Sequence, residues 1–165
     1  MTTPARHTKH AAGFGLVDLA VALAILSALV YFLLDRVLTL QEMGEKTEMD
    51  ETVRTINYAL RLEAASRLAR GTDAQRTPLD QENPVKWLQT PPRHYLGEME
   101  RPPAGAQPAY WYWNPVAHQF VYRPNRSEHL QVENAGNDKS LRFTIDTRTD
   151  PSHPLLQPLR PYEWR

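Results

Sequence analysis

An apolar run near the N-terminus constrains this chain more than any other feature. No side chain between Leu19 and Leu34 is charged, and Ser27 is the most polar residue there. Extended back to Phe14, the run has roughly 21 residues, and a helix of about 20 residues crosses a bilayer core of about 30 Å. The run contains no proline that would break a helix. It therefore predicts a membrane-spanning helix at residues 14–35.

The residues that flank the run indicate its orientation in the membrane. They also help to decide between a membrane-spanning helix and other interpretations of the run. Basic residues precede it, among them Arg6 and Lys9, and this favours a cytoplasmic N-terminus. A cleaved secretory signal peptide has a shorter apolar region, about 7–15 residues, and a small-x-small site after it. No such site stands cleanly after Tyr31. A plain membrane anchor is the other alternative. Neither alternative explains Asp18, because a carboxylate inside a membrane segment is costly and usually has a partner.

The residues around Asp18 resemble the start of type IV pilins and pseudopilins. Prepilins of that family have a short basic leader ending in Gly, then Phe, a small or polar residue, two aliphatic residues and an acid. This chain reads GFGLVD from Gly13 to Asp18. The resemblance implies a leader at residues 1–13, cleavage between Gly13 and Phe14 by a prepilin peptidase, and methylation of the new amine of Phe14. It also implies that Asp18 meets the N-terminal amine of a neighbouring subunit, and a nearby cation makes a buried carboxylate tolerable.

Three departures from the usual family pattern favour a minor pilin or pseudopilin over a major, fibre-forming pilin. The acid at the fifth mature position is Asp18 where the family usually has Glu, and the second mature position is Gly15. Asp35 stands where many major pilins have the proline that kinks their helix. The resemblance implies a structural subunit of a bacterial pilus, type II secretion or related filament machine, and not an enzyme.

The family resemblance also implies partners and a location. The partners are the prepilin peptidase, other pilin or pseudopilin subunits, the inner-membrane assembly platform and membrane lipid. The location is the bacterial inner membrane, with one span, a cytoplasmic N-terminus and a periplasmic C-terminal head that a filament can extract. Nineteen basic and nineteen acidic residues balance, so charge gives no case for nucleic acid as a partner.

After the apolar run, residues 36–70 keep a helical spacing of apolar positions while the sequence turns polar. These positions are Val37, Leu40, Met49, Val53, Ile56, Leu60, Ala64 and Leu68. They predict an amphipathic second half of the same helix, with a stripe that a globular head covers. Glu42 and Lys46 are spaced for an i,i+4 pair on its charged face, and Gly71 is the predicted stop. The alternative is two helices hinged near Gly44.

The rest of the chain predicts a small antiparallel sheet, so the expected fold class is α+β, with the long helix packed on that sheet as in the pilin head. Seven prolines make residues 71–108 a predicted loop. The sheet is expected within residues 109–150, where aromatic alternation predicts a hairpin of Ala109–Trp113 and Gln119–Arg123. Two more strands are expected, at His129–Glu133 and Leu141–Asp146, on either side of a turn signal.

The tail, residues 151–165, contains four prolines, which exclude a regular helix or a central strand. It predicts an extended strap across the head, and a mobile arm for a partner is the alternative. Its candidate anchors are Leu155, Leu156, Leu159 and Trp164.

Two features of the head could form ligand sites, and each also has a purely structural interpretation. Its aromatic residues suit either a stacking platform or a thin core, and the core is favoured; they are Tyr110, Trp111, Tyr112, Trp113, Phe120 and Tyr122. The loop Glu133–Ser140 has oxygen donors that suit calcium, but such clusters are more often turns.

No metal site, cofactor or catalytic constellation is predicted. The histidines have no metal-binding spacing, and the absence of cysteine excludes disulfides and thiolate zinc sites. A function of another class remains open: a membrane-anchored periplasmic binding domain that does not polymerise and uses its aromatic surface.

Overall fold

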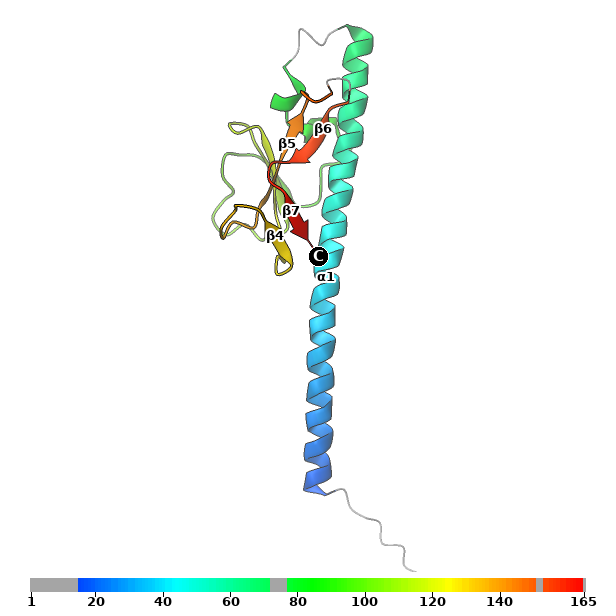
Figure 1. Cartoon of the computed structure of the whole chain (residues 1–165), viewed down its shortest axis with the longest axis vertical. Helices are drawn as coiled ribbons and strands as arrows, with labels where there is room; N and C mark the ends of the chain where they lie inside the picture. Colours follow the sequence, from blue (N-terminus) through cyan, green and yellow to red (C-terminus); the bar gives the residue numbers. More distant parts are fainter. Residues whose placement is uncertain (1–14, 72–76, 151–152, 165) are drawn as a thin grey trace, which may run out of the picture. The chain divides into compact units, whose positions relative to one another are not determined.

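The structure, a computed structural model, describes residues 15–71, 77–150 and 153–164. Its fold is α+β: one long apolar helix, α1 (Leu16–Arg70), packed with a small mixed sheet and a two-stranded sheet. The chain divides into two units between Thr39 and Leu40, so α1 contributes residues to both (Figure 1).

Helix α1 is a single element of 55 residues. It runs through Gly44 without interruption, so the alternative of two hinged helices is wrong. The predicted start at Phe14 lies outside the described residues. The helix ends at Arg70, and Gly71 follows with a φ of +64° and donates its N–H to the carbonyl of Leu68. This left-handed conformation is one that glycine adopts without strain, as the sequence predicts.

We expect Gly44→Ala to raise the free energy of unfolding of the head by about 1 kcal/mol, because glycine is the poorer helix former. A Cβ atom at Gly44 would have no neighbour within 4 Å, so the added methyl group meets no steric obstacle. Urea unfolding of the full chain in detergent, followed by tryptophan fluorescence, measures the change. A loss of stability would show that residue 44 has a packing contact that the subunit structure lacks.

After α1 come two short 3-10 helices and seven strands, all within the described residues. The helices are η2 (Leu79–Gln81) and η3 (Pro84–Trp87). The strands are β1 (Tyr95–Glu98), β2 (Tyr110–Asn114), β3 (Gln119–Arg123), β4 (Leu130–Val132), β5 (Leu141–Asp146), β6 (Leu155–Pro158) and β7 (Tyr162–Trp164). One sheet has the order β1-β2-β3-β5-β6, and β4 pairs with β7 in the second sheet.

The predicted aromatic hairpin is present. Strands β2 and β3 pair antiparallel, with Trp111 opposite Tyr122 and Trp113 opposite Phe120. Side chains alternate between the two faces of a strand, so these four rings share one face. Strand β5 has the bounds expected from sequence and pairs with β3 and β6.

Two pairings differ from the expected antiparallel sheet. Strand β1 lies within the predicted proline-rich loop and pairs parallel with β2, so the five-stranded sheet is mixed. Strand β4 pairs with β7 and not with β5, the strand that follows it after the predicted turn. Strand β5 already has β3 and β6 on its two edges, which leaves β4 to pair with the C-terminal segment.

The tail is an extended strap, as predicted, and it supplies both β6 and β7. Strand β6 lies at the edge of the five-stranded sheet, where prolines are tolerated because one edge needs no ladder hydrogen bonds. Leu156 and Trp164 are buried anchors, whereas Leu159 is 46% exposed and the prediction for it is wrong.

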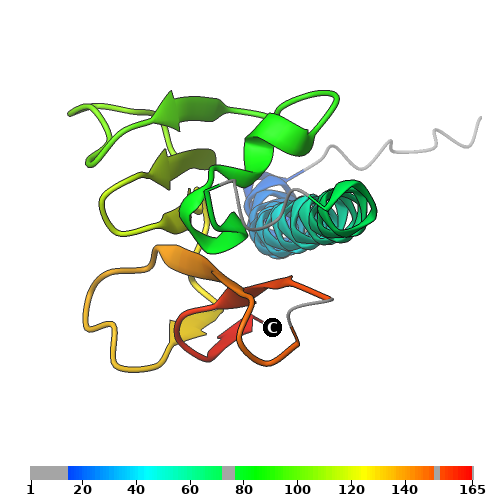
Figure 2. The ribbon, with the colours of Figure 1, turned by 90° about the horizontal axis from the view of Figure 1, so that it is seen from above.

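The core lies between the sheets and the part of α1 that follows Leu40 (Figure 2). Met49, Ile56 and Leu60 from the predicted stripe are buried against rings of the hairpin, and Val53 packs beside them. The ends of the stripe do not reach the core, since Leu40 and Leu68 are exposed. On the outer face of the sheet, the proline-rich segment packs Met99 and Ala106 on a second, smaller cluster of Tyr110, Tyr112 and Val121.

Candidate functional site: the exposed helix and its junction with the head

The sequence predicts a processing and assembly site at Gly13, Phe14 and Asp18. Gly13 and Phe14 lie outside the described residues. Asp18 is exposed in the first turn of α1, and its Oδ2 accepts the backbone N–H of Gly15 at 3.1 Å. A carboxylate in the first turn satisfies a free N–H group and faces the positive end of the helix dipole. Asp18 therefore stabilises the start of α1.

The helix that follows Asp18 exposes its large apolar side chains on all sides. Between Leu16 and Leu34 these side chains are 45–87% exposed. The segment is long and apolar enough to cross a membrane, and none of its most apolar stretch is buried. Such a surface is unstable in water. The segment is thus consistent with a single-pass membrane anchor, although signal sequences share this length and composition.

Where α1 joins the head, a buried carboxylate of the helix holds two distant parts of the chain. Glu42 is 3% exposed. Its Oε1 accepts the backbone N–H of His129 at 3.0 Å and the indole N–H of Trp164 at 2.9 Å. Its Oε2 lies 2.8 Å from Nδ1 of His129. Burial alone would raise the pKa of Glu42, but the hydrogen bonds from His129 and Trp164 outweigh burial and hold this pKa below its ordinary value.

A second carboxylate, one turn further along α1, holds the segment between β3 and β4. Glu45 accepts the hydroxyl of Tyr122 at 2.8 Å and the backbone N–H groups of Asn125 and Arg126 at 2.6 and 3.1 Å. Burial and the adjacent Glu45 both raise the pKa of Tyr122, so its phenol stays protonated and donates.

Lys46 completes this junction by donating to the backbone carbonyl of Trp164 at 2.6 Å. We call the set of Glu42, Glu45 and Lys46 the helix clasp. The sequence suggested a solvated pair of Glu42 with Lys46; instead both side chains bind the C-terminal strand. Sequence spacing alone could not find the clasp, because its partners lie 77–122 residues away.

Near the end of α1, Arg67 fastens the segment that follows the helix. It is 2% exposed and donates to Glu63 and to Glu82, each at 2.9 Å, and to the carbonyl of Thr77 at 2.8 Å. Its guanidinium also lies 5.9 Å from the ring centre of Trp87. A buried arginine needs such paired hydrogen bonds, so this cluster serves the packing of the head.

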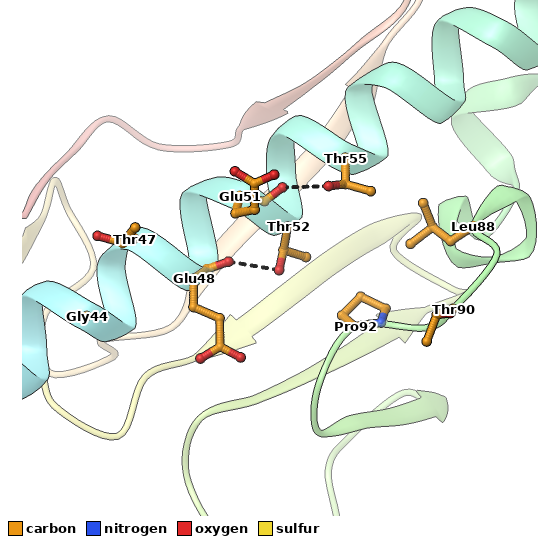
Figure 3. A pocket seen from close by; sticks show the side chains of 9 residues that line it. All are labelled: Gly44, Thr47, Glu48, Glu51, Thr52, Thr55, Leu88, Thr90 and Pro92. Atoms are coloured by element: carbon orange, nitrogen blue, oxygen red, sulfur yellow. Dashed lines mark hydrogen bonds between the residues drawn. The ribbon is translucent and has the colours of Figure 1, made fainter.

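A groove lies between the exposed face of α1 and the segment after η3 (Figure 3). It has a volume of about 470 Å³ and is lined by helix residues between Gly44 and Thr55 and by Leu88, Thr90 and Pro92. We call it the helix groove. Its helix side carries three threonines, Thr47, Thr52 and Thr55, and two carboxylates, Glu48 and Glu51.

A wider groove of about 740 Å³ crosses the outer face of the five-stranded sheet. Its lining includes the side chains of Arg101, Arg123, Arg142 and Asp138. Asp138 binds Arg123 at 3.2 Å and Arg142 at 3.1 Å. Burial would raise the pKa of Asp138, but hydrogen bonds from Ser140 and Arg142 lower it. The loop suggested as a calcium site thus has its central carboxylate paired with arginines.

The aromatic residues of the hairpin form core and not an open platform, as the sequence favours. All six are at most 9% exposed. Within the described residues, no three His, Asp or Glu side chains gather in a way that could hold a metal ion. The histidines have separate surroundings: His94 faces the carbonyl of Ala109, and His153 pairs with Asp150. His118 has a buried Nδ1 with no hydrogen-bond partner in the described part of the chain.

No family model, curated protein or solved structure matches the chain.

Proposed function

We propose that this protein is a pilin-like subunit of the minor pilin or pseudopilin type. A prepilin peptidase cleaves it between Gly13 and Phe14, and the processed chain enters a filament of a pilus, type II secretion or related machine. The single observation that carries the proposal is α1, an exposed apolar helix with Asp18 in its first turn that continues without a break into the core helix of the head.

The physical chemistry of Asp18 supports an assembly role. Its carboxylate is tolerable next to an apolar helix while it caps the backbone N–H of Gly15. In a filament, where subunits cover this helix, the carboxylate loses its contact with water. A cation then has to offset the desolvation of the charge, and the amine of a neighbouring Phe14 is such a cation. The pair also sets the axial position of one helix against the next.

Intact mass of the membrane-extracted chain tests the processing step. With a prepilin peptidase co-expressed, the chain is expected to lose the mass of residues 1–13 and to gain one methyl group. Without the peptidase the full-length mass should remain. An unchanged mass in both samples would contradict the proposal.

Asp18→Ala tests the assembly role. We expect at least tenfold less protein in the sheared filament fraction, because about 1.4 kcal/mol of lost pairing energy already corresponds to a tenfold change. Asp35→Ala is the matched control, since Asp35 is also an exposed acid on α1 but stands after the apolar run. Equal incorporation of the two variants would argue against a specific role of Asp18.

The wider groove on the outer face of the sheet favours a second candidate, a membrane-anchored periplasmic binding domain that does not polymerise. Three arginines line that groove together with two acids, Glu100 and Asp138, and the excess of arginine suits a small anionic ligand. Under this alternative the chain keeps its Gly13–Phe14 bond in cells that contain prepilin peptidase and never appears in a filament fraction.

A further inference from the structure

The wider groove on the outer face of the five-stranded sheet, which we call the outer groove, has a floor of two tyrosines. Tyr110 and Tyr112 alternate with the two core tryptophans of β2, so their side chains face away from α1. On β3, Arg123 stands opposite Tyr110 and Val121 stands opposite Tyr112. On β5, Arg142 stands opposite Val121. The strand register therefore brings two arginines and two tyrosines to one face of the sheet.

The hydroxyls of both tyrosines lack a partner within the described residues. Tyr110 and Tyr112 are 9% and 6% exposed, and tyrosines buried to this extent usually find a hydrogen-bond partner. Among the described residues, only Nδ1 of His118 is a fully buried side-chain atom without a partner. The two hydroxyls are therefore open to the groove that both tyrosines line. Burial raises the pKa of Tyr112, so its hydroxyl is protonated and can donate to a ligand.

The arginines of the outer groove keep most of their donors unused. Each guanidinium has five N–H donors. Within the described residues, Arg123 uses one of them, for Asp138. Arg142 uses two, for Asp138 and Gln119. Arg101, which also lines the groove, forms no hydrogen bond or ion pair with a described residue. The groove thus holds positive charge whose hydrogen bonds are not satisfied by the protein.

The anion that the outer groove already holds indicates which anion it accepts. One carboxylate oxygen of Asp138 lies 3.2 Å from Arg123, and the other lies 3.1 Å from Arg142. Planar carboxylates match the fork of a guanidinium group. The three arginines exceed the two acids of the lining, Glu100 and Asp138, by one charge. A monoanion neutralises this excess, whereas a dianion such as phosphate leaves negative charge uncompensated.

We propose that the outer groove binds a monocarboxylate carried on an apolar body. Arg101 binds the carboxylate with a free guanidinium, and Arg123 and Arg142 add their unused donors. Tyr112 donates its hydroxyl. The apolar body lies against Val121 and the three prolines of the lining, where it is removed from water.

A free organic acid and the C-terminus of a peptide both have this chemistry, and a groove of about 740 Å³ has room for either. All lining residues lie in the head, between Glu100 and Arg142. The site therefore names a ligand class for the groove that supports the second candidate function, and it is equally compatible with a subunit that enters a filament.

Isothermal titration calorimetry with the full chain in a non-ionic detergent tests the site. The probe is phenylpropionate, and phenylpropionamide is the matched control because it has the same apolar body without the charge. Inorganic phosphate tests for general anion binding. We expect phenylpropionate to bind at least tenfold more tightly than either control compound, since the carboxylate gains charge-assisted hydrogen bonds.

A tripeptide that ends in phenylalanine distinguishes the two sources of the carboxylate. Tighter binding of the tripeptide than of phenylpropionate identifies a peptide C-terminus as the ligand. Weaker binding of the tripeptide identifies a free organic acid. The same tripeptide with an amidated C-terminus is the control in this comparison.

Two variants remove donors that bond to nothing among the described residues, so the melting temperature should not change. Arg101→Gln is expected to weaken phenylpropionate binding at least tenfold, because a charged donor is lost. Tyr112→Phe should weaken it about threefold, because a neutral donor is lost. Arg61→Gln is the matched control and should bind like wild type, since Arg61 is an exposed arginine of α1 outside the groove.

Four results would overturn the site. They are equal binding of phenylpropionate and its amide, phosphate binding as tight as that of phenylpropionate, unchanged affinity in Arg101→Gln or Tyr112→Phe, and an equal loss in Arg61→Gln. Failure of the proposed function is seen separately, in the intact mass and the filament fraction of wild type. A chain that is cleaved and assembled but does not bind phenylpropionate keeps the pilin-like function and loses the site. A chain that binds phenylpropionate but is never cleaved keeps the site and loses that function.

Discussion

Trp111→Ala is expected to lower the free energy of unfolding of the head by about 4 kcal/mol, a typical cost for deleting a large buried ring. Trp111 is 3% exposed. Its ring centre lies 4.6 Å from that of Phe120 and 4.4 Å from that of Tyr122. These rings lie between the sheet and α1 in the core, so the cavity would open where the two layers meet.

Urea unfolding of the full chain in detergent, followed by near-ultraviolet circular dichroism, measures this loss. Tyr58→Ala is the control, because Tyr58 is an aromatic residue of α1 that is 73% exposed. That change should stay within about 0.5 kcal/mol of wild type. A Trp111→Ala variant as stable as Tyr58→Ala would show that the hairpin does not pack on the helix as described.

Glu42→Ala has the second largest expected effect, a loss of about 3 kcal/mol, because it leaves buried donors without an acceptor. The variant removes the acceptor for the backbone N–H of His129 and for the indole of Trp164. Glu42→Gln keeps one acceptor oxygen and a similar shape, so its cost should be smaller. The same urea experiment measures both variants.

Glu51→Gln is the control for the helix clasp. Glu51 lies on the same helix and forms an ion pair with Arg54, in which both side chains are 66% exposed. Exposed pairs contribute about 0–1 kcal/mol. If Glu42→Ala cost no more than Glu51→Gln, the clasp would not fasten the C-terminal strand to the helix.

The pH dependence of stability offers an independent check on Glu42. Its pKa is lower in the folded state than the ordinary value of 4.5. A carboxyl group with a lowered folded pKa contributes stability above its unfolded pKa and loses it as pH falls through the folded pKa. Wild type should therefore lose stability below pH 4.5 more steeply than Glu42→Gln. Equal slopes in acid would contradict the hydrogen-bonded carboxylate.

The helix clasp bears on the proposed function because it fastens two segments of the head to α1. Glu42 and Lys46 hold β7, and Glu45 holds the segment after β3. The helix groove lies on another face of the same turns of α1, at Gly44 to Thr55.

Local features of this protein followed from its sequence. The long helix and its end at Gly71 were predicted, because helix formation depends on neighbours three or four residues away and on one conformation that glycine favours. The aromatic hairpin was predicted for the same reason, since its two strands are joined by a short turn. The core positions Met49, Ile56 and Leu60 could also be identified from their spacing.

Only the tertiary structure decided how distant segments combine. The parallel pairing of β1, the pairing of β4 with β7 and the burial of Glu42 join residues that no sequence spacing relates. A four-residue strand among prolines is too short to produce a recognisable pattern in the sequence. A charged residue on a helix is normally predicted to face solvent. The burial of Glu42 becomes favourable only when the N–H groups of His129 and the indole of Trp164 arrive together, and that is a property of the folded chain.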